Sequence, residues 1–67
     1  MNLENELNYL SEKIEEIETL ISRNEYLLKN TITFRLRKTV EIQIKVLEEE
    51  KEILESILSI LTIKALE

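Results

Sequence analysis

The residues of this chain that could do chemistry are its carboxylates, its serine hydroxyls and a group of basic side chains near the middle. The 67 residues include no His and no Cys, and also no Gly, Pro or Trp. Without His, a serine nucleophile lacks its usual general base, and without either residue the commonest zinc ligands are missing. We therefore expect no enzymatic activity, no metal site and no cofactor.

The densest acidic run is Glu48-Glu49-Glu50, which is followed by Glu52. Carboxylate oxygens are the ligands that Ca²⁺ and Mg²⁺ prefer. On a helix, however, successive side chains point in different directions, so these carboxylates do not converge on one ion. We interpret the run as a solvated helix face.

Basic residues are concentrated in the centre of the chain. Residues 29–45 carry a net charge of +4, whereas residues 1–28 carry −5 and residues 46–67 carry −4. An arginine-rich segment can grip phosphate, which makes an anion or nucleic-acid contact one hypothesis. Because the whole chain has a net charge of −5, we favour pairing with the Glu-rich end of a neighbouring molecule, or hydration. The candidate anion contacts are Thr33, Arg35, Arg37 and Lys38.

The nucleic-acid hypothesis takes its sharpest form if the central segment is a strand. Residues 31–46 alternate polar and apolar, with several β-branched side chains, which is typical of a strand. A strand over residues 31–37 would place Thr33, Arg35 and Arg37 on one outer face. Two such strands paired across a dimer axis fit a major groove, as in β-ribbon readers of DNA.

The stretch Thr33-Phe34-Arg35-Leu36 resembles the strand of ribbon-helix-helix repressors. This resemblance, over residues 31–37, implies a small dimeric DNA- or RNA-binding protein. The chain departs from the family pattern after the strand, where the Gly- or Asn-containing turn between the family's two helices is missing. A long N-terminal helix is also not part of that motif.

The elements that must position these side chains are clearest in the first third of the chain. Apolar residues recur there at alternating spacings of four and three, which is the a/d repeat of a coiled-coil seam. The repeat predicts an amphipathic helix over residues 3–29, with Asn2 as N-cap and Asn30 in the left-handed conformation that ends helices. The predicted seam consists of Leu3, Leu7, Leu10, Ile14, Ile17, Ile21, Asn24 and Leu28.

Asn24 occupies a seam position where Leu or Ile would be more stabilising. A buried Asn in such a seam fixes the register and the number of partners at a cost in stability. The alternative is that the helix is close to its end and that Asn24 is partly exposed. The sequence supports both interpretations equally.

The last third of the chain predicts a second helix with a wider apolar surface. A two-stranded seam uses only the a and d positions, whereas this helix is apolar at roughly four positions in seven. We therefore expect it to contact more than one neighbour, the first helix and a second chain. The predicted oligomer interface consists of Leu47, Ile53, Leu54, Ile57, Leu58, Ile60 and Leu61.

The boundary between the two helices is the least determined feature. Val40, Ile44 and Leu47 share a helix face, so we predict a second helix over residues 39–66, capped by Thr39. Residues 30–38 then form a short extended or irregular connection. The alternatives are a β-strand or β-hairpin between the helices, for which no Asn-Gly turn is present, and one unbroken helix.

A chain this short buries only about 60% of its unfolded surface, and it has neither disulfides nor metal ligands to compensate. We therefore predict one all-α domain over residues 1–67, an antiparallel helical hairpin that dimerises into a four-helix bundle. The predicted function is a non-enzymatic oligomerisation or protein-interaction module, which the sequence does not distinguish from a virion or scaffold component. The alternative function is nucleic-acid binding. Without a signal peptide or a membrane-spanning stretch, we expect a cytoplasmic protein.

Overall fold

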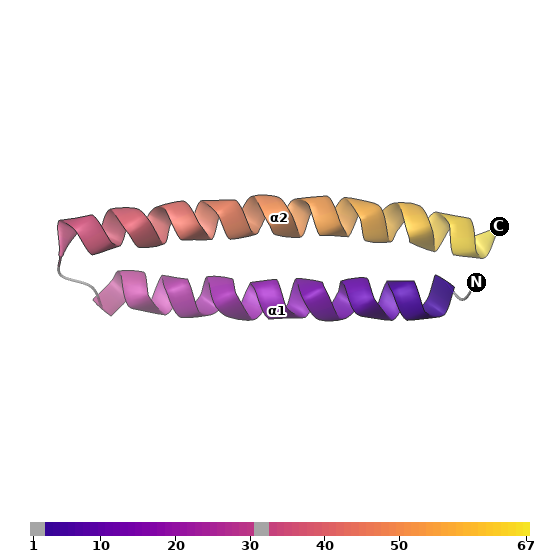
Figure 1. Ribbon diagram of the computed structural model, residues 1–67, viewed down its shortest axis with the longest axis horizontal. Coiled ribbons are helices and arrows are strands. Elements are labelled where there is room, and N and C mark those ends of the chain that lie inside the picture. Colours follow the sequence, from indigo (N-terminus) through magenta and orange to yellow (C-terminus); the bar gives the residue numbers. More distant parts are fainter. Residues whose placement is uncertain (1–2, 31–32) are drawn as a thin grey trace.

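The computed structural model describes residues 3–30 and 33–67, which form two helices lying side by side in opposite directions (Figure 1). Helix α1 runs over Leu3–Asn30 and helix α2 over Phe34–Leu66. The start of α1 and the end of α2 lie together at one end of the rod, the open end, while the end of α1 and the start of α2 lie at the other, the loop end (Figure 1). The predicted all-α antiparallel hairpin is confirmed.

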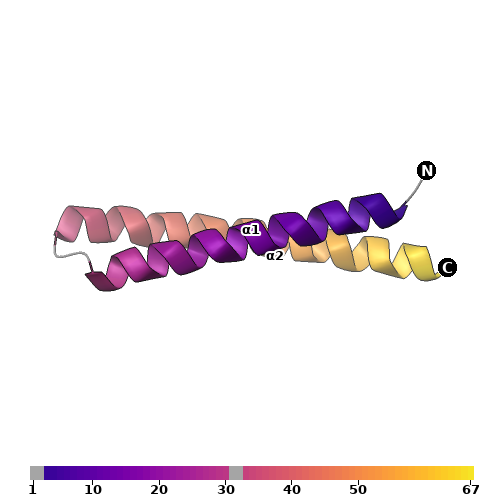
Figure 2. The ribbon, with the colours of Figure 1, turned by 90° about the horizontal axis from the view of Figure 1, so that it is seen from below.

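The hairpin is a thin rod rather than a compact domain. It measures 51 × 14 × 14 Å, and its Cα radius of gyration is 15.4 Å. A compact domain of this length would have a radius of gyration of about 11 Å. Seen from below, the two helices cross near their middles (Figure 2). Only one face of each helix therefore has a neighbour within the chain.

One seam between the helices makes up the core. The buried residues follow the alternating four-and-three spacing on α1 and include a single residue of α2: Leu10, Ile14, Ile17, Ile21 and Val40. The spacing continues from Val40 along α2 through residues that are all half-buried: Ile44, Leu47, Lys51, Leu54, Leu58 and Leu61. Each helix thus contributes a heptad repeat, as in an antiparallel coiled coil.

Helix α2 begins five residues earlier than predicted. Thr33, not Thr39, is the N-cap residue, with extended dihedral angles of φ −77° and ψ 125°. Its carbonyl accepts a hydrogen bond from the Arg37 N–H at 3.0 Å. Thr39 lies inside the helix, where its Oγ1 donates to the Arg35 carbonyl at 3.1 Å. The predicted connection over residues 30–38 is therefore corrected to at most residues 31–33.

The alternative prediction, a strand over residues 31–37, is wrong for residues 34–37, which are helical. Residues 31–32 lie outside the described part of the chain. The physical reason is burial. The helix that includes residues 34–37 continues past them and places Val40 and Ile44 against α1, whereas the described part of the hairpin contains no strand with which a strand here could pair. Because polar and apolar residues alternate here, a helix cannot bury all of the apolar ones, and Phe34 and Leu36 are exposed on its surface.

The end of α1 also differs from the prediction. No described residue has a positive φ, so Asn30 does not adopt the left-handed conformation. Instead its side-chain Nδ2 donates to the Tyr26 carbonyl at 2.8 Å. The Arg37 Nη1 reaches across from α2 and donates to the Leu28 carbonyl at 3.1 Å. Arg37 thereby supplies a donor to one of the last four carbonyls of α1, which a helix end leaves without intrahelical partners. The predicted N-cap, Asn2, lies outside the described residues.

Candidate interaction surface

The two long sides of the hairpin, left and right of the seam, differ in their chemistry. In an antiparallel coiled coil, the residues beside the seam on one side come from the same heptad position of both helices. One side of this hairpin is lined by exposed apolar residues from both helices, and we call it the apolar flank. It consists of Tyr9 and Leu20 on α1 and of Ile42, Val46, Ile53, Ile57 and Ile60 on α2.

Two surface recesses show that both helices contribute to the apolar flank. The recess nearer the loop end has a volume of about 340 Å³ and is lined by Leu20, Asn24, Ile42, Gln43, Val46 and Leu47. The recess nearer the open end has a volume of about 370 Å³ and is lined by Asn5, Glu6, Tyr9, Leu10, Ile57 and Leu61. Ile53 and Ile60 extend the row of Val46 at intervals of seven residues, so they lie on the same face of α2.

The flank is poorly covered by the rest of the chain. Its five α2 side chains are between 41% and 62% exposed. The cause is the width of the apolar arc of α2, which α1 covers on one side only. Isolated exposed apolar residues are ordinary on protein surfaces, but a group of seven on one side of a small monomer indicates an interaction site.

The opposite side of the hairpin, the acidic flank, carries carboxylates. The residues that directly follow five seam positions are all exposed glutamates: Glu18, Glu25, Glu41, Glu48 and Glu55. Glu18 forms an ion pair with Lys51, with Nζ 3.9 Å from Oε1. The two flanks therefore differ sharply, and only the apolar flank offers surface whose burial is favourable.

Lys51 is a seam residue that the sequence analysis missed. It is half-buried and occupies the one polar position in the α2 repeat from Val40 to Leu61. The Lys51 and Glu18 side chains are 32% and 53% exposed, so their ion pair contributes at most about 1 kcal/mol. The signal was present in the sequence, because Lys51 lies four residues after Leu47 and three before Leu54.

The structure divides the predicted oligomer interface into two groups. Leu47, Leu54, Leu58 and Leu61 are half-buried and belong to the α2 seam. Ile53, Ile57 and Ile60 are exposed and belong to the apolar flank. Ile42, Val46, Tyr9 and Leu20 join them there, and the sequence analysis had not assigned these four to the interface.

The predicted α1 seam residues are distributed along the contact with α2. Leu10, Ile14, Ile17 and Ile21 are buried, and Leu3, Leu7, Asn24 and Leu28 are half-buried towards the helix ends. The Asn24 Nδ2 donates to the Leu20 carbonyl of its own helix at 2.8 Å. Its amide is therefore satisfied within α1, and the structure shows no hydrogen bond from Asn24 to another described helix.

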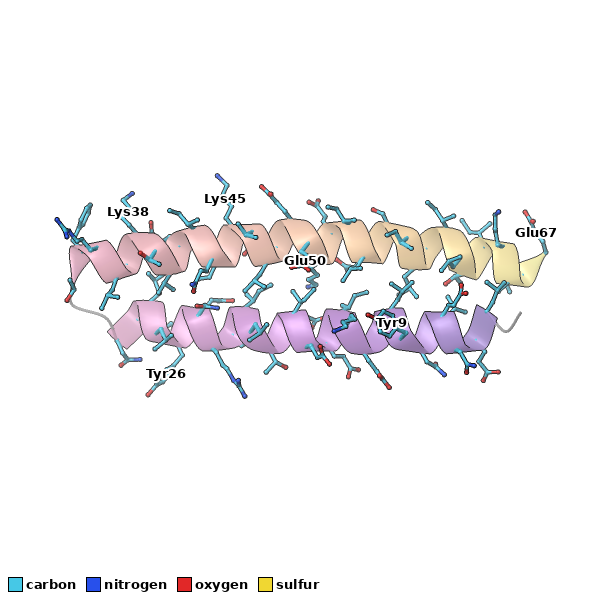
Figure 3. All side chains as sticks on the ribbon, viewed as in Figure 1. Tyr9, Tyr26, Lys38, Lys45, Glu50 and Glu67 are labelled. Carbon is cyan, nitrogen blue, oxygen red and sulfur yellow. The ribbon has the colours of Figure 1, made fainter. Side chains whose placement is uncertain are left out.

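The candidate anion contacts all lie exposed at the loop end but do not form one cradle. Arg37 donates to the carbonyl of Leu28, while Lys38 lies 3.9 Å from Glu41 and 5.8 Å from the centre of the Phe34 ring. Lys38 points away from α1, as does Lys45 about two turns further along (Figure 3). The side chains diverge, so this end presents diffuse positive charge rather than a pocket.

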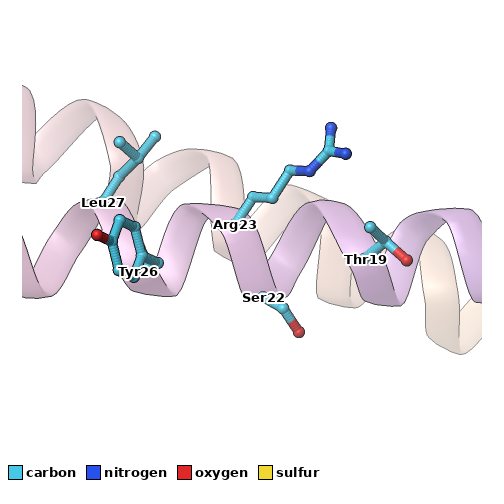
Figure 4. A pocket seen from close by; sticks show the side chains of 5 residues that line it. All are labelled: Thr19, Ser22, Arg23, Tyr26 and Leu27. Atoms are coloured by element: carbon cyan, nitrogen blue, oxygen red, sulfur yellow. The ribbon is translucent and has the colours of Figure 1, made fainter.

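The remaining surface offers no enclosed site among the described residues. A further recess, of about 470 Å³, lies on α1 alone, and its five lining side chains project from that one helix (Figure 4). No cluster of three or more described Asp, Glu, His or Cys residues is arranged to hold a metal ion. Neither described helix combines the length and the apolar character needed to cross a membrane.

Comparison with known proteins finds no match: no family model, no curated protein and no solved structure is significantly similar to this chain. The function must therefore be argued from the surface itself.

Proposed function

We propose that this chain is a non-enzymatic self-association module, in which two hairpins pack through their apolar flanks and form a four-helix bundle. The observation that carries the proposal is the row of exposed apolar residues along α2, which are between 41% and 62% exposed, with Tyr9 and Leu20 of α1 on the same side of the seam. A second copy of the chain brings an identical apolar side, and two-fold symmetry lets each flank cover the other.

The exposed surface area of the hairpin supports a second copy of the chain as the partner. The chain exposes 5562 Å². Folded monomers of 8.0 kDa expose about 4,450 Å², so the hairpin exposes about 1,100 Å² more than its mass requires. One partner in a standard protein interface buries about 800 Å². Packing two flanks together would therefore remove an amount of surface that a stable dimer needs.

The position of α2 supports the same arrangement. Five of the seven flank residues lie on α2, and the seam occupies the neighbouring face of that helix. In the dimer, α2 would contact α1 of its own chain and α2 of the other chain. The bundle would thus have the two α2 helices near its centre, and each acidic flank would stay in water.

The experiment is a pair of aspartate substitutions at adjacent positions of α2. Ile60 lies on the apolar flank, whereas its neighbour Ser59 is exposed on another face. We expect Ile60→Asp to dissociate the assembly, because a buried unpaired carboxylate is costly, and we expect Ser59→Asp to have no effect. Light scattering after size-exclusion chromatography measures both masses, and circular dichroism verifies that both variants are helical. Equal masses for the two variants would refute this assignment of the interface.

A further inference from the structure

The hairpin is electrically polar along its length, and this polarity selects between two ways of pairing the flanks. Residues 23–30 and 33–45, which form the loop end, contain six basic and two acidic residues, a net charge of +4. Residues 3–22 carry −5 and residues 46–67 carry −4, and these two segments run side by side to the open end. One end of the rod is therefore positive and the rest is strongly negative.

We infer that the two hairpins pair with their loops at opposite ends of the bundle, so that the basic loop end of each copy lies beside the acidic half of the other. This inference rests on the proposed self-association. A two-fold axis parallel to the rods would instead place the two positive ends together and the two negative ends together. Like charges closer than the Debye length, about 8 Å at physiological ionic strength, repel one another.

Two basic side chains of the loop end form no ion pair within the described part of the hairpin. Arg35 and Lys45 are exposed, and within residues 3–30 and 33–67 neither has an ion-pair partner. Lys45 points away from α1 (Figure 3). The acidic half has exposed carboxylates on both helices, among them Glu12 and Glu55.

The apolar recesses fit the same arrangement. On α2, one recess is lined by Ile42, Gln43, Val46 and Leu47 and the other by Ile57 and Leu61. Each lies about 10 Å from the level of Lys51 near the middle of α2, at about 1.5 Å per residue. A two-fold axis across the rods at that level would bring the recess of one copy onto the other recess of its partner. Tyr9, which is 59% exposed beside the open-end recess, would then face the loop-end recess of the second copy.

Distances between single spin labels test the arrangement. The chain has no Cys, so Thr62→Cys and Glu52→Cys each give one label per copy, at exposed positions near the open end and near the middle. With loops at opposite ends, two labels at position 62 lie about 30 Å further apart along the rod than two labels at position 52. Double electron–electron resonance should therefore give a clearly longer distance for Thr62→Cys.

The outcomes distinguish a failure of the opposed arrangement from a failure of the proposed self-association. Similar short distances for both labels would overturn the opposed arrangement while leaving self-association intact. No dipolar signal from either label, together with a mass of 8.0 kDa, would overturn both.

A charge-reversal variant gives an independent test of how the two hairpins are oriented. Arg35→Glu/Lys45→Glu should raise the dissociation constant by about tenfold if the loop ends face acidic surface, because four positive charges per dimer become negative. With loop ends placed together, the same variant would associate more tightly, which would contradict the inference.

Discussion

At the scale of single residues, the seam is interrupted at two polar positions, one on each helix. Asn24 bonds to its own helix, and Lys51 pairs with an exposed glutamate at 3.9 Å. Neither interaction offers the stability that an apolar side chain would give at a half-buried position. Polar seam residues of this kind restrict register and partner number at a cost in stability. Apolar substitutions at these two positions should therefore raise the free energy of unfolding.

Asn24→Leu should raise the free energy of unfolding by about 1 kcal/mol, because Leu would fill the recess beside Leu20 and Leu47. In a domain of this size the melting temperature would rise by about 4–8 °C, measured by circular dichroism at a fixed protein concentration. The control is Ser22→Leu, on the exposed surface of α1, with an expected change of less than about 0.5 kcal/mol. A fall in melting temperature for Asn24→Leu would mean that the amide is required in the seam.

At the scale of elements, the first helix was predictable almost to the residue because its heptad repeat is regular. The predicted range of 3–29 compares with Leu3–Asn30 in the structure. The start of the second helix was not predictable, because residues 31–46 fit both the two-residue period of a strand and the spacing of a helix face. Alternation is a local pattern, whereas the burial of Val40 and Ile44 depends on α1, which the local pattern does not include. Thr39 was mistaken for a cap because threonine bonds equally well to a carbonyl one turn back.

Proline substitution tests where α2 begins. Phe34 is the first helical residue and follows an extended Thr33, so Phe34→Pro should be tolerated with little loss of stability. Thr39→Pro lies in the helix interior and should cost about 3 kcal/mol, because it removes a backbone hydrogen bond and clashes with the preceding turn. Urea denaturation monitored by circular dichroism measures both. A small effect of Thr39→Pro would instead place the helix start near residue 39.

At the scale of the whole molecule, the sequence predicted that α2 has more apolar surface than one neighbour can cover. It did not separate the residues that face α1 from those that face away. That separation needs the register of the two helices, which assigns Leu54 and Leu61 to the seam and Ile53 and Ile60 to the exposed flank. The candidate site therefore became specific only when both helices were placed together.

The mass of the unmodified chain in solution tests the central claim most directly. Sedimentation equilibrium from low to high micromolar concentration should give a mass near twice 8.0 kDa, falling only on dilution. The proposed burial of the apolar flank by a second copy requires that result. A mass of 8.0 kDa throughout this range, from a chain that stays helical, would contradict it.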